Sequence, residues 1–174
     1  MRNLTKYAAG VTAAALLATA PAQASGCWKP ESTAAAKVRD LQSRLMVATL
    51  RCRAIGADIE GSYGAFVRGN RDTLQAANAL LKAQFATGDR AGERAYDSFA
   101  TALANQYGGD ATNEHLCRGF AAAADDAAAA AGDLGKLLAI AESLGPPPPL
   151  PGGECPVTFA ALMHAAVDQV PPQR

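Results

Sequence analysis

The chain has 174 residues, of which 49% are hydrophobic, 18% charged and 6% aromatic, and its formal net charge is +0. This length suits one domain with a substantial core, and an alanine-rich chain with few aromatic residues favours closely packed helices, because alanine has the highest helix propensity. A net charge of zero argues against a nucleic-acid-binding protein, which carries an excess of basic side chains.

The first 24 residues have the three parts of a secretory signal peptide. Arg2 and Lys6 supply the positive start, residues 8–20 are apolar, and residues 22–24 read Ala-Gln-Ala, a small-x-small cleavage sequence. The apolar run is shorter than the roughly 20 residues that span a bilayer. We therefore expect cleavage after Ala24 and an exported protein, periplasmic or secreted, that is not transmembrane once the signal peptide is removed.

All four cysteines follow the expected cleavage site. They are Cys27, Cys52, Cys117 and Cys155. An even number of cysteines in an oxidising compartment predicts two disulfides, with three possible connectivities. The alternative is a lipoprotein anchored at Cys27, because a Ser-Gly-Cys sequence resembles the end of a lipobox, although leucine usually stands where Ala24 does. Lipidation would leave an odd number of cysteines, so we favour the disulfides.

Two helices are predicted in the first half of the exported part. The first has apolar residues at steps of 3 and 4, a period typical of an amphipathic helix, with Ser32 or Thr33 as its N-cap and Gly56 at its end. The second spans residues 62–87, and Asn70 lies in its apolar seam, where a polar residue can fix the register of a helical interface. The apolar seam of the first helix is Val38, Leu41, Leu45, Ala48, Cys52 and Ile55.

Two more helices are predicted before the proline-rich segment. The third spans residues 93–107 and has aromatic and leucine side chains along one face. The fourth spans residues 113–144, and Gly132 and Gly135 predict a kink within it.

The sequence GPPPPLPGG, residues 145–153, cannot continue a helix, and its four successive prolines adopt an extended polyproline conformation. We interpret it as a stiff strap that returns the chain to the bundle, in preference to a docking ligand for a proline-binding domain. Residues 155–170 predict a short amphipathic helix. The expected organisation is a signal peptide at 1–24, a four-helix bundle at 25–145, the strap at 146–154, and a C-terminal helix and tail at 155–174.

The predicted topology selects one disulfide connectivity. Short turns between long helices favour an up-down-up-down antiparallel bundle, which places Cys27 and Cys155 at one end and Cys52 and Cys117 at the other. The first helix is roughly 35 Å long at 1.5 Å per residue, whereas a disulfide requires α-carbons within about 7 Å. We therefore predict an all-α fold, an antiparallel four-helix bundle with a short C-terminal helix, stapled by Cys27–Cys155 and Cys52–Cys117.

Several segments of the exported part are similar to those of a known group of proteins. These segments are CW at residues 27–28, VRDLQSRLMVATLRCR, YGAFVRGNRDTLQAANALLKAQF and AYDSFATALANQYG. They resemble a group of small exported four-cysteine proteins of Gram-negative bacteria, with similarity through Cys117. The group has no established function, and some members carry the label adenosylhomocysteine hydrolase. That enzyme is much larger and binds NAD on a Rossmann domain. This sequence does not support the label, because it has no G-x-G-x-x-G motif, no alternating strand pattern and no room for two such domains.

The histidines give weak signals for a metal or cofactor site. His115 is two residues from Cys117, and residues two apart on a helix do not share a face, so we expect a solvated histidine. His164 beside Met163 raises the alternative of a b-type haem, held by a histidine and Met46. The covalent haem signature C-x-x-C-H is absent, and Met46 is more simply a core residue. We predict no metal ligands and no cofactor.

A basic stripe is predicted on the first helix, where Lys37, Arg44 and Arg51 recur every seven residues. Such a stripe can bind an envelope protein or an anionic envelope polymer, but it is more often a solvated face. Asp125 and Asp126 are expected to be solvated acids, and no G-x-S-x-G, H-E-x-x-H or P-loop motif occurs. We predict no catalytic residues and expect a binding or structural envelope protein. The alternative is a small-molecule or haem carrier that uses the bundle interior, and a hydrolase ranks last.

Overall fold

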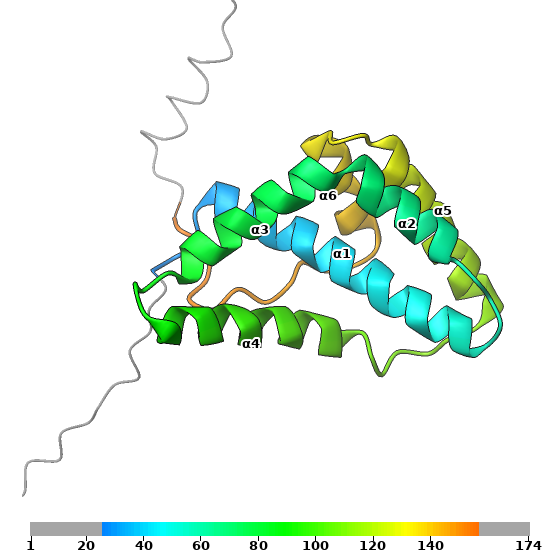
Figure 1. Cartoon of the computed structure of the whole chain (residues 1–174), viewed down its shortest axis with the longest axis horizontal. Coiled ribbons are helices and arrows are strands. Elements are labelled where there is room, and N and C mark those ends of the chain that lie inside the picture. Colours follow the sequence, from blue (N-terminus) through cyan, green and yellow to red (C-terminus); the bar gives the residue numbers. More distant parts are fainter. Residues whose placement is uncertain (1–25, 157–174) are drawn as a thin grey trace, which may run out of the picture.

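The structure is a computed structural model that describes residues 26–156. Within this range the chain forms helices and no strand, which confirms the all-α prediction (Figure 1). The helices are α1 (Pro30–Ala54), α2 (Glu60–Gly69), α3 (Arg71–Phe85), α4 (Arg90–Gln106), α5 (Glu114–Ala129) and α6 (Leu134–Ser143). None of these helices combines the length and the apolar composition needed to cross a membrane. The predicted signal peptide and residues 157–170 of the predicted C-terminal helix lie outside the described residues.

The central element is α1, which contacts all five other helices and crosses the middle of the molecule in Figure 1. Its predicted seam is buried from Val38 to Cys52, whereas Ile55 is exposed because the helix ends at Ala54. The predicted caps at Ser32 and Thr33 are wrong. The helix begins instead at Pro30, whose fixed φ and missing N–H suit a first helical turn.

Both of the longer predicted helices after α1 are broken in two. The predicted helix at 62–87 divides at Asn70 into α2 and α3, and the predicted helix at 113–144 divides at residues 130–133 into α5 and α6. Gly132 adopts a positive φ of 88° in the second break, as the kink prediction anticipated, whereas Gly135 lies inside α6. The four predicted helices thus correspond to α1, α2 with α3, α4, and α5 with α6.

Asn70 joins the two helix breaks. Its side chain is buried, and its amide donates hydrogen bonds to the carbonyl oxygens of Phe66 (2.9 Å) and Ala127 (2.7 Å). Its Oδ1 accepts a hydrogen bond from the backbone N–H of Gly132 at 2.8 Å. The predicted polar residue in the interface therefore pairs the Gly132 N–H and adds a second hydrogen bond to the Phe66 and Ala127 carbonyls, which also accept backbone N–H groups. It fastens α2, which packs along α5, to the α5–α6 junction (Figure 1).

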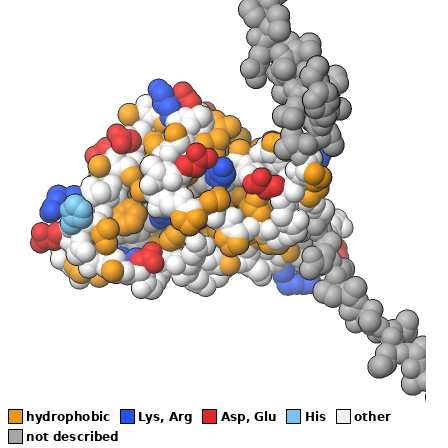
Figure 2. All heavy atoms as spheres, turned by 180° about the vertical axis from the view of Figure 1, so that it is seen from behind, with side chains coloured by type: hydrophobic (Ala, Val, Ile, Leu, Met, Phe, Trp, Pro, Cys, Tyr) orange, Lys and Arg blue, Asp and Glu red, His pale blue; other side chains and the backbone are white. Residues whose placement is uncertain are grey.

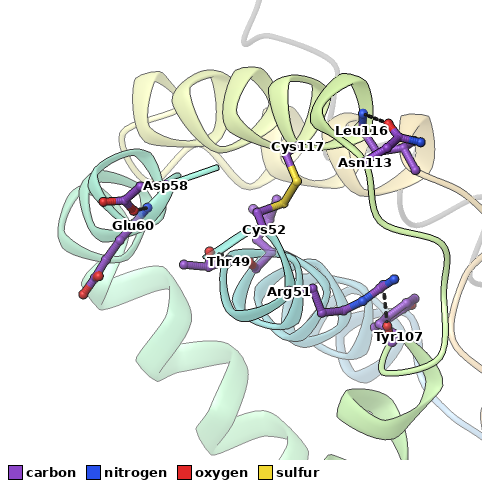
Figure 3. Close-up of a disulfide and its surroundings, with 10 residues drawn as sticks. Thr49, Arg51, Cys52, Asp58, Glu60, Tyr107, Asn113, Leu116 and Cys117 are labelled. Atoms are coloured by element: carbon purple, nitrogen blue, oxygen red, sulfur yellow. Dashed lines mark hydrogen bonds between the residues drawn. A yellow bond between two sulfur atoms is a disulfide. The ribbon is translucent and has the colours of Figure 1, made fainter. Parts of the chain in front are cut away.

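The cysteines form the two predicted pairs. Cys27 and Cys155 are bonded, with α-carbons 4.6 Å apart, and so are Cys52 and Cys117, with α-carbons 5.7 Å apart. Figure 3 shows the second bond joining the end of α1 to α5. The prediction of a disulfide-stapled helical fold is confirmed.

Candidate functional site beneath the proline strap

Residues 145–155 return the chain to the N-terminal end of α1, as the strap interpretation predicts, and pass between α1 and α4 in Figure 1. Trp28 holds them. Its backbone N–H donates to the Gly153 carbonyl and its carbonyl accepts from the Cys155 N–H, both at 2.8 Å. Its indole N–H donates to the Pro151 carbonyl at 2.7 Å. One residue therefore makes three hydrogen bonds to the strap.

Trp28 is also the centre of an aromatic cluster. The indole is fully buried, and its ring centroid lies 5.6 Å from that of Phe85 and 5.5 Å from that of Phe99. Aromatic pairs at this spacing contribute about 0.5–1.5 kcal/mol each beyond their buried area. The cluster joins the end of α3 and the middle of α4 to the place where the strap meets α1.

A buried group of charged and polar side chains lies near the start of the strap. Asp40 and Arg44 stand one turn apart on α1, Tyr107 caps the end of α4, and all three are almost fully buried. The Tyr107 hydroxyl donates to Asp40 Oδ1 at 2.6 Å and accepts from Arg44 Nη2 at 2.8 Å. Arg44 Nη2 also lies 3.4 Å from both Asp40 Oδ2 and the Pro146 carbonyl oxygen. We call Asp40, Arg44 and Tyr107 the buried triad.

The strap covers the guanidinium of this triad closely. A Cβ at Gly145 would lie 2.8 Å from Arg44 Nη1, and Gly145 has a φ of +145°, which L side chains rarely adopt. The guanidinium also lies over the Tyr107 ring, with Cζ 4.6 Å from the ring centroid. Glycine is therefore required where the strap leaves α6.

Burial has the largest effect on the pKa values of Asp40 and Tyr107. It raises the pKa of the Asp40 carboxyl above its ordinary value of 3.8, although the Tyr107 hydrogen bond and the Arg44 charge both act to lower it. Burial, together with the hydrogen bond to Asp40, raises the pKa of Tyr107 to about 12. Tyr107 therefore keeps its proton at neutral pH and remains the donor to Asp40. The triad joins α1, α4 and the strap through hydrogen bonds among its side chains and to the Pro146 carbonyl.

The basic stripe is not the solvated face that spacing predicted. Arg44 is buried in the triad, and Lys37 Nζ lies 2.9 Å from Glu142 Oε1 on α6. Arg51 Nη1 donates to the Tyr107 carbonyl at 2.8 Å, as Figure 3 shows, and lies 3.8 Å from Asp110 Oδ2. Each cation of the stripe thus has an acidic or carbonyl partner within the protein. A buried arginine persists in a core only with such pairing, and spacing along one helix does not reveal the partners.

The residues weighed for a metal site are not brought together. His115 is exposed near the start of α5, as expected, and Cys117 is bonded to Cys52. His164 lies outside the described residues. Within residues 26–156 no group of three or more histidine, cysteine or acidic side chains is placed to hold a metal ion.

Met46 is not the core residue that was predicted. It is 37% exposed on α1, so it does not face the bundle interior. Met163, the other methionine weighed for haem, lies outside the described residues. Asp125 and Asp126 are exposed on α5, as predicted.

A hollow of about 730 Å³ lies at the turn between α3 and α4, lined by Lys82, Asp89, Glu93 and Tyr96 among others. Lys82 Nζ is 5.9 Å from the Tyr96 ring centroid, and the Tyr96 hydroxyl donates to Asn78 Oδ1. Asp89 is already occupied as the N-cap of α4. The volume falls in the range of small-ligand pockets. It is therefore a second candidate site, on the surface of the bundle.

In comparisons with known proteins, no family model, no curated protein and no solved structure matches this chain. The resemblance to exported proteins of Gram-negative bacteria stays a prediction.

Proposed function

We propose that the protein is an exported helical-bundle protein of the cell envelope, with a binding or structural role. The observation that carries this proposal is the pairing of all four cysteines in two disulfides, which is typical of proteins in oxidising compartments. The signal-peptide pattern of the first 24 residues supports it. A cysteine bonded to Cys155 cannot also carry a thioether-linked lipid, so the pairing supports the non-lipidated form.

The buried triad fastens parts of the fold together, and this supports a role other than catalysis for the protein. Asp40, Arg44 and Tyr107 are the described groups that could perform buried acid–base chemistry. Each of them is hydrogen-bonded to another, and the strap lies against Arg44. Groups held in this way fasten helices together and have no open side for a substrate.

The binding surface we propose is an apolar strip on α1. Met46 and Leu50 stand one turn apart and are 37% and 60% exposed, and Arg53 continues the same exposed face. Contiguous apolar patches mark protein-binding surfaces, and we propose that Met46 and Leu50 form the exposed part of such a patch. Because the cations of the basic stripe are paired internally, we propose an envelope protein as the partner, in preference to an anionic polymer. On the face shown in Figure 2, acidic and basic side chains are interspersed, with no field of a single sign.

The alternative of a small-molecule carrier is better supported at the hollow between α3 and α4 than in the bundle interior. Leu41, Leu45, Phe66 and Leu81 are at most 1% exposed and fill the space between the helices. The hollow offers a tyrosine ring and charges of both signs to a small polar ligand.

Two measurements test the proposal. An intact mass from the native envelope fraction should begin at Ser25 and show four thiols only after reduction. A photo-crosslinking residue at Leu50 should then capture an envelope protein, whereas the same residue at Asp125 on α5 should not. Equal capture at both positions, or none at Leu50, contradicts the α1 surface. A ligand-dependent rise in melting temperature that Tyr96→Ala abolishes would favour the carrier instead.

A further inference from the structure

The two disulfides differ in their exposure to solvent. Cys27 is exposed and Cys155 is half-buried, whereas Cys52 and Cys117 are each 1% exposed. Thiol–disulfide exchange requires a thiolate to approach one sulfur of the bond in line, so access controls its rate. A reductant in solution therefore reaches the Cys27–Cys155 bond and not the Cys52–Cys117 bond.

The strap depends on this exposed bond because it has few other attachments. Five of its residues are prolines, at positions 146–149 and 151, and a proline nitrogen has no hydrogen to donate. Three of its hydrogen bonds to the bundle go to Trp28, the neighbour of Cys27. Beyond these, Pro148 is buried, Leu150 packs against the core and the Pro146 carbonyl accepts a long hydrogen bond of 3.4 Å from Arg44. The short hydrogen bonds of the strap to the bundle thus all lie beside the disulfide.

Loosening of the strap would also change the surroundings of the triad. The strap backbone at Gly145 and Pro146 lies directly against the Arg44 guanidinium. Arg44 Nε is buried and has no hydrogen-bond partner, so this group gains hydration when its cover moves. The bundle itself keeps the Cys52–Cys117 bond and the contacts of α1 with the other helices.

We propose that the Cys27–Cys155 bond is a reducible latch that holds the proline strap closed over the buried triad. A thiolate of a dithiol reductant attacks one sulfur of the bond and forms a mixed disulfide. The second thiol of the reductant then closes its own disulfide. Two electrons and two protons pass to Cys27 and Cys155, which become free thiols. The strap then separates from Trp28, and Arg44 becomes accessible to water. This redox regulation goes beyond the proposed function, and it does not depend on which partner the protein binds.

The oxidised mature protein, titrated with dithiothreitol, tests the latch. Alkylation followed by peptide mapping should label Cys27 and Cys155 at a reductant concentration about ten-fold below that needed for Cys52 and Cys117. Trp28 is the only tryptophan, so a ¹⁵N–¹H spectrum contains one indole signal. Solvent exchange of that indole N–H should become about ten-fold faster or more once the exposed bond is reduced. The far-ultraviolet circular dichroism should stay unchanged.

A double variant and a chemical probe complete the test. Cys27→Ser with Cys155→Ser should show the fast indole exchange without reductant and no further change on its addition. Phenylglyoxal should modify Arg44 only after reduction, whereas Arg53, which is exposed, should react in both states. Simultaneous reduction of both disulfides overturns the proposal. So does slow indole exchange, or an unreactive Arg44, once Cys27 and Cys155 are free.

Discussion

Arg44 shows how the cost of losing one charge depends on its surroundings. Its side chain is 7% exposed beside an Asp40 side chain that is 4% exposed, whereas the side chains of the pair Lys37 and Glu142 are 25% and 62% exposed. Arg44→Ala leaves a buried carboxylate without its partner, and we expect a loss of about 3–5 kcal/mol in the free energy of unfolding. Lys37→Ala, on the same stripe, should cost about 1 kcal/mol or less. Urea denaturation of both variants measures the difference, and equal losses would contradict a buried role for Arg44.

Asp40 should give the protein a characteristic pH dependence. Burial raises the carboxyl pKa in the folded state, so the folded protein binds this proton more tightly than the unfolded chain does. The resulting stabilisation is full below the ordinary value of 3.8 and is lost as the pH rises through the raised pKa. Asp40→Asn removes this titration. We therefore expect the wild type to gain stability relative to Asp40→Asn as the pH is lowered from 7 toward 4. Urea unfolding at several pH values checks this, and a difference that is flat or of opposite slope would refute it.

At the scale of the elements, the helix breaks depend on contacts between distant residues. Asn70 connects the α2–α3 break to Gly132 in the α5–α6 break through buried hydrogen bonds. Asn70→Ala leaves the Gly132 N–H unpaired and removes the side-chain hydrogen bonds to the Phe66 and Ala127 carbonyls, so we expect a loss of about 2–4 kcal/mol in stability. Asn105→Ala, an exposed change within α4, should stay within about 0.5 kcal/mol. Thermal and urea unfolding compare the two, and a small effect at Asn70 would show that the breaks are independent.

The strap should tolerate a side chain at one glycine and not at another. Gly145 and Gly153 both have a positive φ, but a Cβ at Gly145 meets Arg44 at 2.8 Å, whereas nothing lies within 4 Å at Gly153. Gly153→Ala should cost about 1–2 kcal/mol from its backbone conformation alone. Gly145→Ala should cost about 1–3 kcal/mol more, because it also displaces the guanidinium. The two unfolding curves, recorded side by side, should differ in this order. The reverse order would mean that the strap does not rest on Arg44.

The sequence allowed the helices and the disulfides to be predicted, because both depend on local period and on chain topology. It did not reveal the break at Asn70, since the apolar seam continues on both sides, and it predicted a kink but not a full break near Gly132. The hydrogen bond that joins the two breaks links residues 62 positions apart. Nor did it reveal the triad. Asp40, four residues before Arg44, was the available signal. Whether the Asp40–Arg44 pair is buried or exposed depends on contacts with Tyr107 and the strap. The spacing of residues along one helix does not predict such contacts.

At the scale of the molecule, the two disulfides close loops of different length around the central helix. The bonded cysteines are 128 positions apart in one case and 65 in the other. The chain-entropy model gives about 4–5 kcal/mol for each, a difference below about 1 kcal/mol. Cys52→Ala with Cys117→Ala also removes buried sulfur atoms, so we expect it to lower the melting temperature more than Cys27→Ala with Cys155→Ala. Calorimetry of the two double variants measures both melting temperatures. A lower melting temperature for the Cys27 and Cys155 variant would show that the disulfide at the strap stabilises the protein more.

The Cys52–Cys117 bond lies nested inside the loop that Cys27–Cys155 closes. Cys27 and Cys52 are the first two cysteines to be synthesised. If cysteines were oxidised in that order, these two would form a disulfide with each other and the chain would be mispaired. Once α1 has formed, its length of roughly 35 Å at 1.5 Å per residue keeps these two thiols apart. The first helix is therefore a molecular spacer that blocks the nearest wrong bond. The chain therefore reaches its native disulfide pairing directly only if α1 forms faster than Cys27 and Cys52 are oxidised.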